Sequence, residues 1–338
     1  MVEVFVPREI EPGETRVAAV PETIKKMVKL GLKVTVEAGA GTGAHIADAA
    51  FEAAGATVAA DATAAWQAAD VVLKVQPPRQ NEALGKHEFE LAKEGALVVS
   101  FLVPSEHLDQ IPTLTGRKIS CFSMNLLPRI TLAQKMDVLS SQTNIAGYKA
   151  VLMAAATLGK YFPMLMTAAG TIKPAHVVIM GAGVAGLQAI ATARRLGAVV
   201  EVSDIRPAVK EQVESLGAKF IDVGFEEGAE DAGGYAKEAS EDFLKRQAEV
   251  VAQRVAGADV VITTAQIPGK KAPVLITEEM VQSMRSGSVI VDLAAPQGGN
   301  CALTKCDETV VAHGVTIIGT ANVAATVPVH ASDTYAKN

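Results

Sequence analysis

The chain has 338 residues and a formal net charge of −6, and 49% of its residues are hydrophobic but only 4% aromatic. This length suits two domains rather than a single core, and the hydrophobic content excludes a disordered chain. The balance of 31 basic against 37 acidic residues argues against a nucleic-acid-binding surface and a polybasic membrane anchor. Three cysteines are too few for a disulfide framework, which favours an intracellular protein.

The chain is apolar enough that a membrane span has to be considered. Its most apolar window, residues 150–172, contains Lys160 and Pro163, so no uninterrupted apolar run approaches the roughly 18 residues of a spanning helix. The N-terminus has the pattern of a strand followed by a charged turn, not that of a signal peptide. We therefore expect a soluble protein.

Short apolar strands alternate with Ala-rich helices in the first third of the chain. Strands are expected at 2–6, 33–37, 57–59, 70–75, 96–102 and 118–122, with helices at 21–30, 48–54 and 62–69. Parallel strands covered on both faces have this apolar character, and the alternation indicates βαβ units. The pattern predicts a first α/β domain that ends near residue 140.

Residues 132–161 contain no proline and only two glycines, so they are expected to form a long helix that connects two domains. A second α/β block follows, with strands expected at 176–180, 199–203, 259–264, 288–293 and 316–318. The predicted fold is therefore two Rossmann-like domains with parallel sheets joined by a long helix. The acidic, glycine-rich residues 224–234 are expected to form a mobile loop.

The sharpest motif is Gly-x-Gly-x-x-Gly at residues 181–186, between an apolar strand and an Ala-rich helix. In such a motif Gly181 permits the tight turn, Gly183 lets the backbone approach a pyrophosphate, and Gly186 lets the helix pack on the strand. The pyrophosphate then lies at the positive end of the helix dipole. The motif predicts a dinucleotide-binding site.

The next strand ends in Asp204, whose carboxylate would accept hydrogen bonds from ribose hydroxyls and repel a 2′-phosphate. Arg206 could reach such a phosphate, but Asp204 is expected to decide the preference, so NAD is predicted. Gln266 follows the strand at 259–264 and could face the adenosine or ribose. A solvated glutamine is an equally open interpretation.

Groups for acid–base chemistry are sparse. A dehydrogenase needs a side chain that takes the substrate proton, and the histidines lie in surface-like contexts. Lys74 is the best-placed ionisable group in the first domain, either as a functional residue or as a strand-end lysine that reaches solvent. Gln134, Asp137 and Ser141 share one face of the expected long helix and could hold a nicotinamide and ribose, or face solvent. The cysteine spacing predicts no metal site.

A resemblance to a known family is carried by five segments, which read PRITLAQKMDVLSSQTNIAGYKA, FPMLMTAAGTIKPAHVVIMGAGVAGLQAIATARRLGA, KEQVESLGAKF, GGYAKE and VDLAAPQGGN. They resemble the NAD(H)-binding component of proton-translocating nicotinamide nucleotide transhydrogenases, in a superfamily that includes alanine dehydrogenase. The resemblance covers essentially the whole chain. It implies one domain over residues 1–140, to which about 327–338 return, and an NAD(H)-binding domain over 141–326. The cofactor would lie in the interdomain cleft.

The resemblance also implies site residues. Those expected to act in catalysis are Arg129, Gln134, Asp137, Ser140 and Tyr235. Those expected to contact NAD(H) are Arg129, Ile130, Thr131, Leu132, Gln134, Lys135, Met136, Asp137, Gly181, Gly183, Val184, Ala185, Gly186, Asp204, Ile205, Arg206, Gly234, Gln247 and Gln266. Gly234 and Tyr235 match a mobile loop that closes over NAD(H) in the family, and at Gln266 a backbone contact is expected.

In alanine dehydrogenases an Arg, a Lys, a His and an Asp handle the amino acid. Arg16 and Lys74 match the first two, but Val103 and Pro296 stand where the catalytic His and Asp would be. Neither residue can move a proton, and direct hydride transfer between two nicotinamides needs only close approach and exclusion of water. The resemblance thus favours a transhydrogenase; an alanine-dehydrogenase-like amino acid dehydrogenase is the alternative, and a non-catalytic NAD-sensing module is a third class.

The activity that the resemblance implies is hydride transfer from NADH to NADP+ held on a partner subunit, coupled by membrane subunits to proton translocation. This is an NAD(P)+ transhydrogenase of the Si-specific/Re-specific type. The expected partners are a second copy in a homodimer, the NADP(H)-binding domain of a β subunit and membrane-spanning subunits, with no nucleic acid. The expected location is cytoplasmic, peripheral on the cytoplasmic face of the inner (plasma) membrane.

Overall fold

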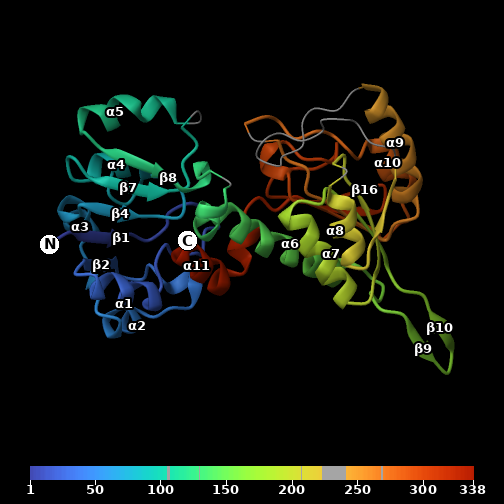
Figure 1. The fold of residues 1–338 in the computed structure, drawn as a ribbon, viewed down its shortest axis with the longest axis horizontal. Helices are drawn as coiled ribbons and strands as arrows, with labels where there is room; N and C mark the ends of the chain where they lie inside the picture. Colours follow the sequence, from blue (N-terminus) through green and yellow to red (C-terminus); the bar gives the residue numbers. More distant parts are fainter. Residues whose placement is uncertain (105–106, 129, 207, 223–240, 268) are drawn as a thin grey trace. The chain divides into compact units, whose positions relative to one another are not determined.

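The computed structural model describes the chain except residues 105–106, 129, 207, 223–240 and 268, and it describes 241–247 without their side chains. These residues divide into two compact units (Figure 1). Unit 1 comprises Met1–Gln142 with Ala324–Asn338, and unit 2 comprises Thr143–Val323. Each unit contains a largely parallel sheet with helices, so the predicted α/β class is confirmed. The loop expected at 224–234 lies outside the described residues.

Unit 1 is built on a six-stranded parallel sheet within the described part of the chain. Its strands, in the order in which they lie side by side, are β3 (Thr57–Ala59), β2 (Lys33–Glu37), β1 (Glu3–Val6), β4 (Val71–Leu73), β7 (Leu97–Ser100) and β8 (Ser120–Ser123). Its helices are α1 (Pro21–Lys29), α2 (Asp48–Ala53), α3 (Ala62–Ala68), α4 (Glu88–Leu91), α5 (Ile111–Gly116) and α11 (Pro328–Lys337). Smaller elements are the β5–β6 pair (Gln80–Asn81, Lys86–His87) and the 3-10 turns η1 (Thr42–Ala44), η3 (Leu108–Gln110) and η4 (Met124–Leu126).

Strand β1 explains why these strands are apolar throughout. Val4 and Val6 lie in a core cluster with α1 and α2, whereas Phe5 packs with Trp66 of α3 and with α4. Successive side chains of a strand point to opposite faces, so a sheet covered by helices on both faces needs an apolar residue at every position.

The C-terminal helix α11 completes the core of unit 1. Tyr335 is 5% exposed, and its hydroxyl donates to the carbonyl of Lys74 at 2.6 Å. The Ser332 hydroxyl accepts from the Val17 amide at 3.1 Å, and the Gln142 amide donates to the Ala331 carbonyl at 3.0 Å. These contacts join the last residues of the chain to strands and turns near its start.

The long helix expected at 132–161 is shorter in the structure. Helix α6 spans Val138–Thr157, and residues before it form a 3-10 helix, η5 (Thr131–Met136). Asp137 breaks the two apart with ψ 78°, and its carboxylate accepts from the Ser140 amide at 2.9 Å and the Ser140 hydroxyl at 2.6 Å. The idea that Gln134, Asp137 and Ser141 share one helical face is therefore wrong, because the helix begins after Asp137.

Unit 2 is built on a seven-stranded sheet in the described part of the chain. Its strands, in spatial order, are β13 (Lys219–Phe220), β12 (Val199–Ser203), β11 (His176–Met180), β14 (Val260–Thr263), β15 (Val289–Asp292), β17 (Val315–Ile318) and β16 (Thr309–Ala312). The pairings are parallel except that the edge strand β16 runs antiparallel to β17. Its helices are α7 (Val184–Arg195), α8 (Val209–Ser215), α9 (Glu241–Ala256) and α10 (Glu278–Ser283), with the 3-10 turn η6 (Ala295–Gln297), while a last 3-10 turn, η7 (Val323–Thr326), begins with the final residue of this unit.

A hairpin that the sequence did not predict leaves the sheet of unit 2. Its strands are β9 (Leu165–Thr167) and β10 (Gly170–Ile172), which pair antiparallel and extend away from the sheet (Figure 1). Met164 and Met166 are 58% and 82% exposed there. No helix among the described residues is both long and apolar enough to cross a membrane.

Candidate nucleotide-binding site

The carboxyl ends of four neighbouring parallel strands of unit 2 meet at one edge of the sheet. Strand β11 ends before Gly181, β12 before Asp204, β14 before Thr264 and β15 at Asp292. Ligands of open parallel sheets bind outside this edge. The edge therefore brings together the glycine motif, Asp204 and the turn that contains Gln266.

The three glycines of the motif have distinct surroundings. Gly181 adopts φ +100°, and a Cβ there would lie 2.6 Å from Thr264 Oγ1. A Cβ on Gly186 would overlap the carbonyl of Gly181, so this glycine allows α7 to approach the turn. A Cβ on Gly183 would meet no atom within 4 Å, so open space lies above this residue. The turn is thus tight on its inner side and open at Gly183, which fits the close approach of a phosphate.

Helix α7 starts at this turn with its first amides available. Gly183 is the N-cap residue and provides no side-chain cap. The amides of a first helical turn have no partner within the helix, and the helix dipole adds positive potential there. Helix α6 lies close beside them, because a Cβ on Gly147 would overlap the carbonyl of Ala185. The N-terminus of α7 can therefore hold an anionic pyrophosphate.

Asp204 connects β12 to the glycine turn. The residue is 7% exposed, and its Oδ2 accepts from the Ala182 amide at 2.7 Å. Arg206 donates to the same carboxylate from Nε at 2.9 Å, from Nη2 at 2.8 Å and from its amide at 2.9 Å. The guanidinium therefore lies on Asp204, while Ile205 between them packs at the edge of the core.

Gln266 does not face open space with its amide group. Its Nε2 donates to the carbonyl of Leu293 at 2.8 Å, which joins the turn after β14 to the turn after β15. Beside it, Thr264 Oγ1 lies 3.2 Å from the carbonyl oxygens of both Met180 and Gly181. The side chain of Gln266 is therefore part of the protein's own turn structure.

The other expected site residues lie in unit 1 or outside the described residues. Exposed residues around η5 are Ile130, Thr131, Leu132, Gln134, Lys135 and Met136. Asp137 and Ser140 are half-buried and bonded to each other. Arg129, Gly234 and Tyr235 lie outside the described residues, and Gln247 lies in α9 where side chains are not described.

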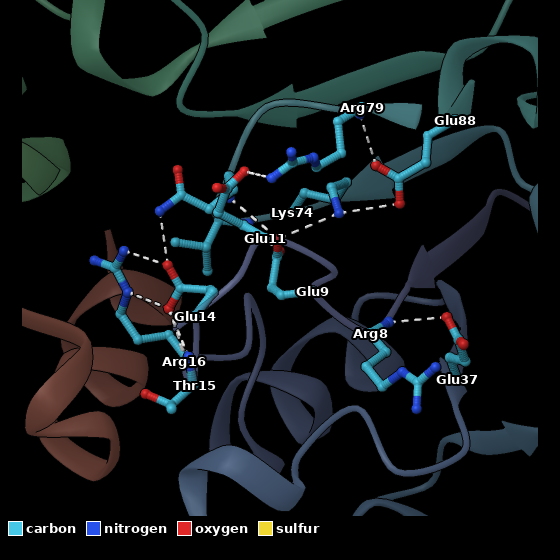
Figure 2. A network of polar contacts seen from close by, with 12 residues as sticks. Arg8, Glu9, Glu11, Glu14, Thr15, Arg16, Glu37, Lys74, Arg79 and Glu88 are labelled. Atoms are coloured by element: carbon cyan, nitrogen blue, oxygen red, sulfur yellow. Dashed lines mark hydrogen bonds and ion pairs between the residues drawn. The ribbon is translucent and has the colours of Figure 1, made fainter. Parts of the chain in front are cut away.

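Unit 1 also contains a buried network of charged side chains, which Figure 2 shows from close by. Lys74 is 1% exposed, and its ammonium lies 3.2 Å from Glu9 Oε2 and 3.2 Å from Glu88 Oε1. Burial raises the pKa of both carboxyls. Burial disfavours the ammonium as well, but the two carboxylates outweigh it and raise the pKa of Lys74. Lys74 is therefore an interior cation, and the alternative of a strand-end lysine that reaches solvent is wrong.

Arg16 belongs to the same network and is 4% exposed. Its guanidinium donates to Glu14 from Nε at 2.8 Å and from Nη2 at 2.6 Å, and Nη1 donates to Gln142 at 2.8 Å (Figure 2). Burial would raise the pKa of Glu14, but the hydrogen bonds and charge of Arg16 lower it to about 2. Both cations that match the substrate-binding residues of alanine dehydrogenases thus hold carboxylates of this chain itself.

The sequence did not point to three polar residues at the nucleotide edge. Thr264 contacts the glycine turn, and Asp292 and Asn300 are both fully buried beneath the neighbouring turns. A signal was present for Asp292, since it ends an apolar strand as Asp204 nearly does. Asn300 lies in an irregular segment, where no periodicity marks burial.

Comparison with known proteins places the whole chain in one family. The model described as "Alanine dehydrogenase/PNT, N-terminal domain" matches residues 5–146, and the corresponding C-terminal domain model matches 150–338. The first of the separate chains of NAD(P) transhydrogenase subunit alpha from Rhodospirillum rubrum is 55% identical over 100% of this chain and 88% of that protein. Alanine dehydrogenase of Methanococcus maripaludis is 32% identical over 87% of this chain and 72% of that protein.

Solved structures give the same order of similarity. Transhydrogenase from Sinorhizobium meliloti superposes with a TM-score of 0.89 at 47% identity, over 99% of this chain and 90% of that one. An L-alanine dehydrogenase superposes with a TM-score of 0.81 at 28% identity, over 99% and 86%. With a Rossmann-like nucleotide-binding unit and these relatives, the chain belongs to the alanine dehydrogenase/PNT family, as a transhydrogenase component.

Proposed function

We propose that this chain binds NAD(H) at the carboxyl edge of the sheet of unit 2 and passes hydride directly to NADP+ held on a partner subunit. The observation that carries the proposal is a nucleotide site without matching substrate chemistry. Arg16 and Lys74 are buried and hold the chain's own Glu14, Glu9 and Glu88. Such paired, desolvated cations are poor ligands for a free amino acid, because its carboxylate would have to displace a buried partner.

The apolar character of Val103 and Pro296 supports the same conclusion. An amino acid dehydrogenase must move protons as well as a hydride, and neither side chain has a titratable group. Between two nicotinamides, NADH gives up a hydrogen with both bonding electrons and NADP+ accepts it, so NAD+ and NADPH form with no proton taken up or released. The protein then has to bind, orient and exclude water.

Each part of the proposed site has a separate task. The open turn at Gly183, with Val184 and Ala185 at the start of α7, would hold the pyrophosphate, and Asp204 would accept from the adenosine ribose. The family resemblance adds the nicotinamide contacts. These are Arg129 to Asp137, Ser140, Gly234, Tyr235, Gln247 and Gln266.

Partner subunits follow from the names of the relatives and from exposed apolar residues. Relatives are named as alpha subunits of transhydrogenases, which implies a complex. Ile130, Leu132 and Met136 are 55%, 88% and 41% exposed beside Gln134, an apolar surface that suits docking of an NADP(H)-binding domain of a β subunit. The exposed hairpin β9–β10 suits a second copy in a homodimer, since most soluble oligomers are symmetric dimers. Proton translocation would belong to membrane-spanning subunits, with this chain peripheral on their cytoplasmic face.

Reconstitution tests the proposal. The chain is mixed with the NADP(H)-binding component of a relative, and NADH-dependent reduction of thio-NADP+ is followed by absorbance. We expect turnover that requires both proteins, and no reduction of NAD+ by L-alanine with this chain alone. Robust oxidation of L-alanine would instead establish an amino acid dehydrogenase. NADH binding without any transfer to the NADP+ analogue would indicate a sensing module and contradict the proposal.

A further inference from the structure

Asp292 is a buried carboxylate whose partners are neutral hydrogen-bond donors. It is 0% exposed at the end of β15. Its Oδ1 accepts from the Thr263 hydroxyl at 2.8 Å and the Ala294 amide at 3.0 Å. Its Oδ2 accepts from the amides of Asn300 and Cys301 at 2.8 and 3.0 Å and from the Thr304 hydroxyl at 2.6 Å. A carboxylate in this setting fixes the path of the whole turn that follows β15, because all five donors belong to β14 or to that turn.

Asn300 passes this constraint to the neighbouring strand end. It is 0% exposed, and its side chain pairs with both polar groups of Ala265. Oδ1 accepts from the Ala265 amide at 3.0 Å, and Nδ2 donates to the Ala265 carbonyl at 2.9 Å and to the Pro273 carbonyl at 2.8 Å. The carboxamide thereby satisfies the backbone of Ala265 at the point where β14 has ended and has no strand to pair with.

The segment held by Asn300 in turn contacts the glycine motif. Thr264, next to Ala265, has its hydroxyl 3.2 Å from the Gly181 carbonyl, and the Thr264 amide donates to Met180 at 2.9 Å. A continuous chain of hydrogen bonds therefore runs from Asp292 through Asn300 and residues 264–265 to Gly181. We call these four connected positions the Asp292–Asn300 clamp.

We propose that Asp292 and Asn300 are positioning residues that set the geometry of the nucleotide edge, without touching the nucleotide themselves. This rests on the proposed function, since it takes NAD(H) to bind at that edge. Burying an aspartate and an asparagine is unfavourable unless every polar atom is paired, whereas apolar residues would fill the same space without that requirement. The polar pair instead specifies one conformation of the turns, and a pyrophosphate that binds to backbone amides depends on that conformation.

Two substitutions loosen the clamp from different sides. Asn300→Ala leaves the Ala265 peptide without its partner. Gly299→Ala forces a side chain onto a residue with φ +81°, where the new Cβ would lie 2.9 Å from Asp292 Oδ2. Gly314→Ala is the matched control, because Gly314 has φ +77° and a Cβ there would lie 2.6 Å from Ser286 Oγ. Gly314 precedes β17 at the amino edge of the same sheet, away from the nucleotide edge.

The measurements are the NADH dissociation constant by fluorescence, the thermal midpoint without nucleotide, and the transfer rate at saturating NADH in the reconstituted mixture. We expect Asn300→Ala and Gly299→Ala to raise the dissociation constant about tenfold, as loss of one or two buried hydrogen bonds allows, with little change in the saturated rate. Gly314→Ala should lower the thermal midpoint to a similar degree and leave the dissociation constant unchanged.

A milder variant covers the case in which Asn300→Ala does not fold. Thr304→Val removes one of the five donors to Asp292 and should raise the NADH dissociation constant about twofold to threefold. The inference is overturned if the wild-type chain binds NADH and the folded clamp variants bind it equally well, or if Gly314→Ala weakens binding as much as they do. A wild-type chain that binds no NADH would overturn the proposed function itself, and the clamp with it.

Discussion

The guanidinium of Arg206 forms a two-point ion pair with the carboxylate of Asp204, with Nε–Oδ1 at 2.9 Å and Nη2–Oδ2 at 2.8 Å. The arginine is the one group near this strand end that the sequence suggested for contact with a 2′-phosphate. In the structure it lies on the carboxylate, which also holds the Ala182 amide of the glycine turn. Nucleotide preference at this site is therefore a property of the pair.

Replacing Asp204 should weaken the preference for NAD(H) over NADP(H). In Asp204→Ala the acceptor for the ribose hydroxyls is lost and Arg206 is released, so NADH should bind about tenfold to a hundredfold more weakly while NADPH binds better. Fluorescence titrations with both nucleotides measure the ratio. Asp222→Ala is the control, because Asp222 is an exposed aspartate paired with Lys210 at 3.2 Å. An unchanged ratio in Asp204→Ala would assign the preference elsewhere.

Two glycines of the motif should respond to alanine in opposite ways. Gly186→Ala places a Cβ on the Gly181 carbonyl, so α7 has to shift and the free energy of unfolding should fall by about 2–4 kcal/mol. Gly183→Ala has no atom within 4 Å of the new Cβ and should leave stability nearly unchanged. The same Cβ fills the space proposed for the pyrophosphate, so NADH binding should be lost. Urea denaturation and NADH titration of both variants check this; intact NADH binding in Gly183→Ala would contradict the proposed pyrophosphate position.

The sequence was most informative where one local pattern determines the structure. The β11 strand, the glycine turn and Asp204 are continuous in the chain, and the apolar strands reflect burial on both faces. Asp137 was misplaced because a polar residue inside an apparently helical stretch can equally be its N-cap. Lys74 and Asn300 could not be assigned, since their partners Glu9 and Ala265 are distant in sequence and pairing depends on the folded sheet.

Removal of Lys74 should destabilise unit 1 in a pH-dependent way. Lys74→Met leaves Glu9 and Glu88 buried without their cation, which should lower the free energy of unfolding by about 3–5 kcal/mol near neutral pH. The pKa values of both carboxyls are already raised by burial, so protons that bind as pH falls favour the folded variant. The loss should therefore shrink as pH falls through those raised values toward the ordinary glutamate range.

Urea denaturation at about pH 7.5 and about pH 5.5 tests this sign. The wild-type contribution of Lys74 itself is constant over that interval, because its raised pKa matters only at alkaline pH. Lys26→Met is the matched control, since its exposed pair with Glu22 at 2.8 Å should change stability by less than about 1 kcal/mol at either pH. An equal loss at both pH values for Lys74→Met would show that the buried carboxylates do not titrate as proposed.

Asp137 should contribute separately to the start of α6 and to hydride transfer. Asn is as good an N-cap as Asp, so Asp137→Asn should keep the bond from the Ser140 amide and change stability little, whereas Asp137→Ala should cost about 1 kcal/mol. If the charged carboxylate orients the nicotinamide end of NAD(H), both variants should lower the reconstituted transfer rate, by about tenfold for the loss of a charged hydrogen bond. Ser140→Ala removes only the hydroxyl bond at 2.6 Å and separates the cap from the charge. A full transfer rate in Asp137→Asn together with a reduced one in Asp137→Ala would mean that the residue acts through the helix start alone.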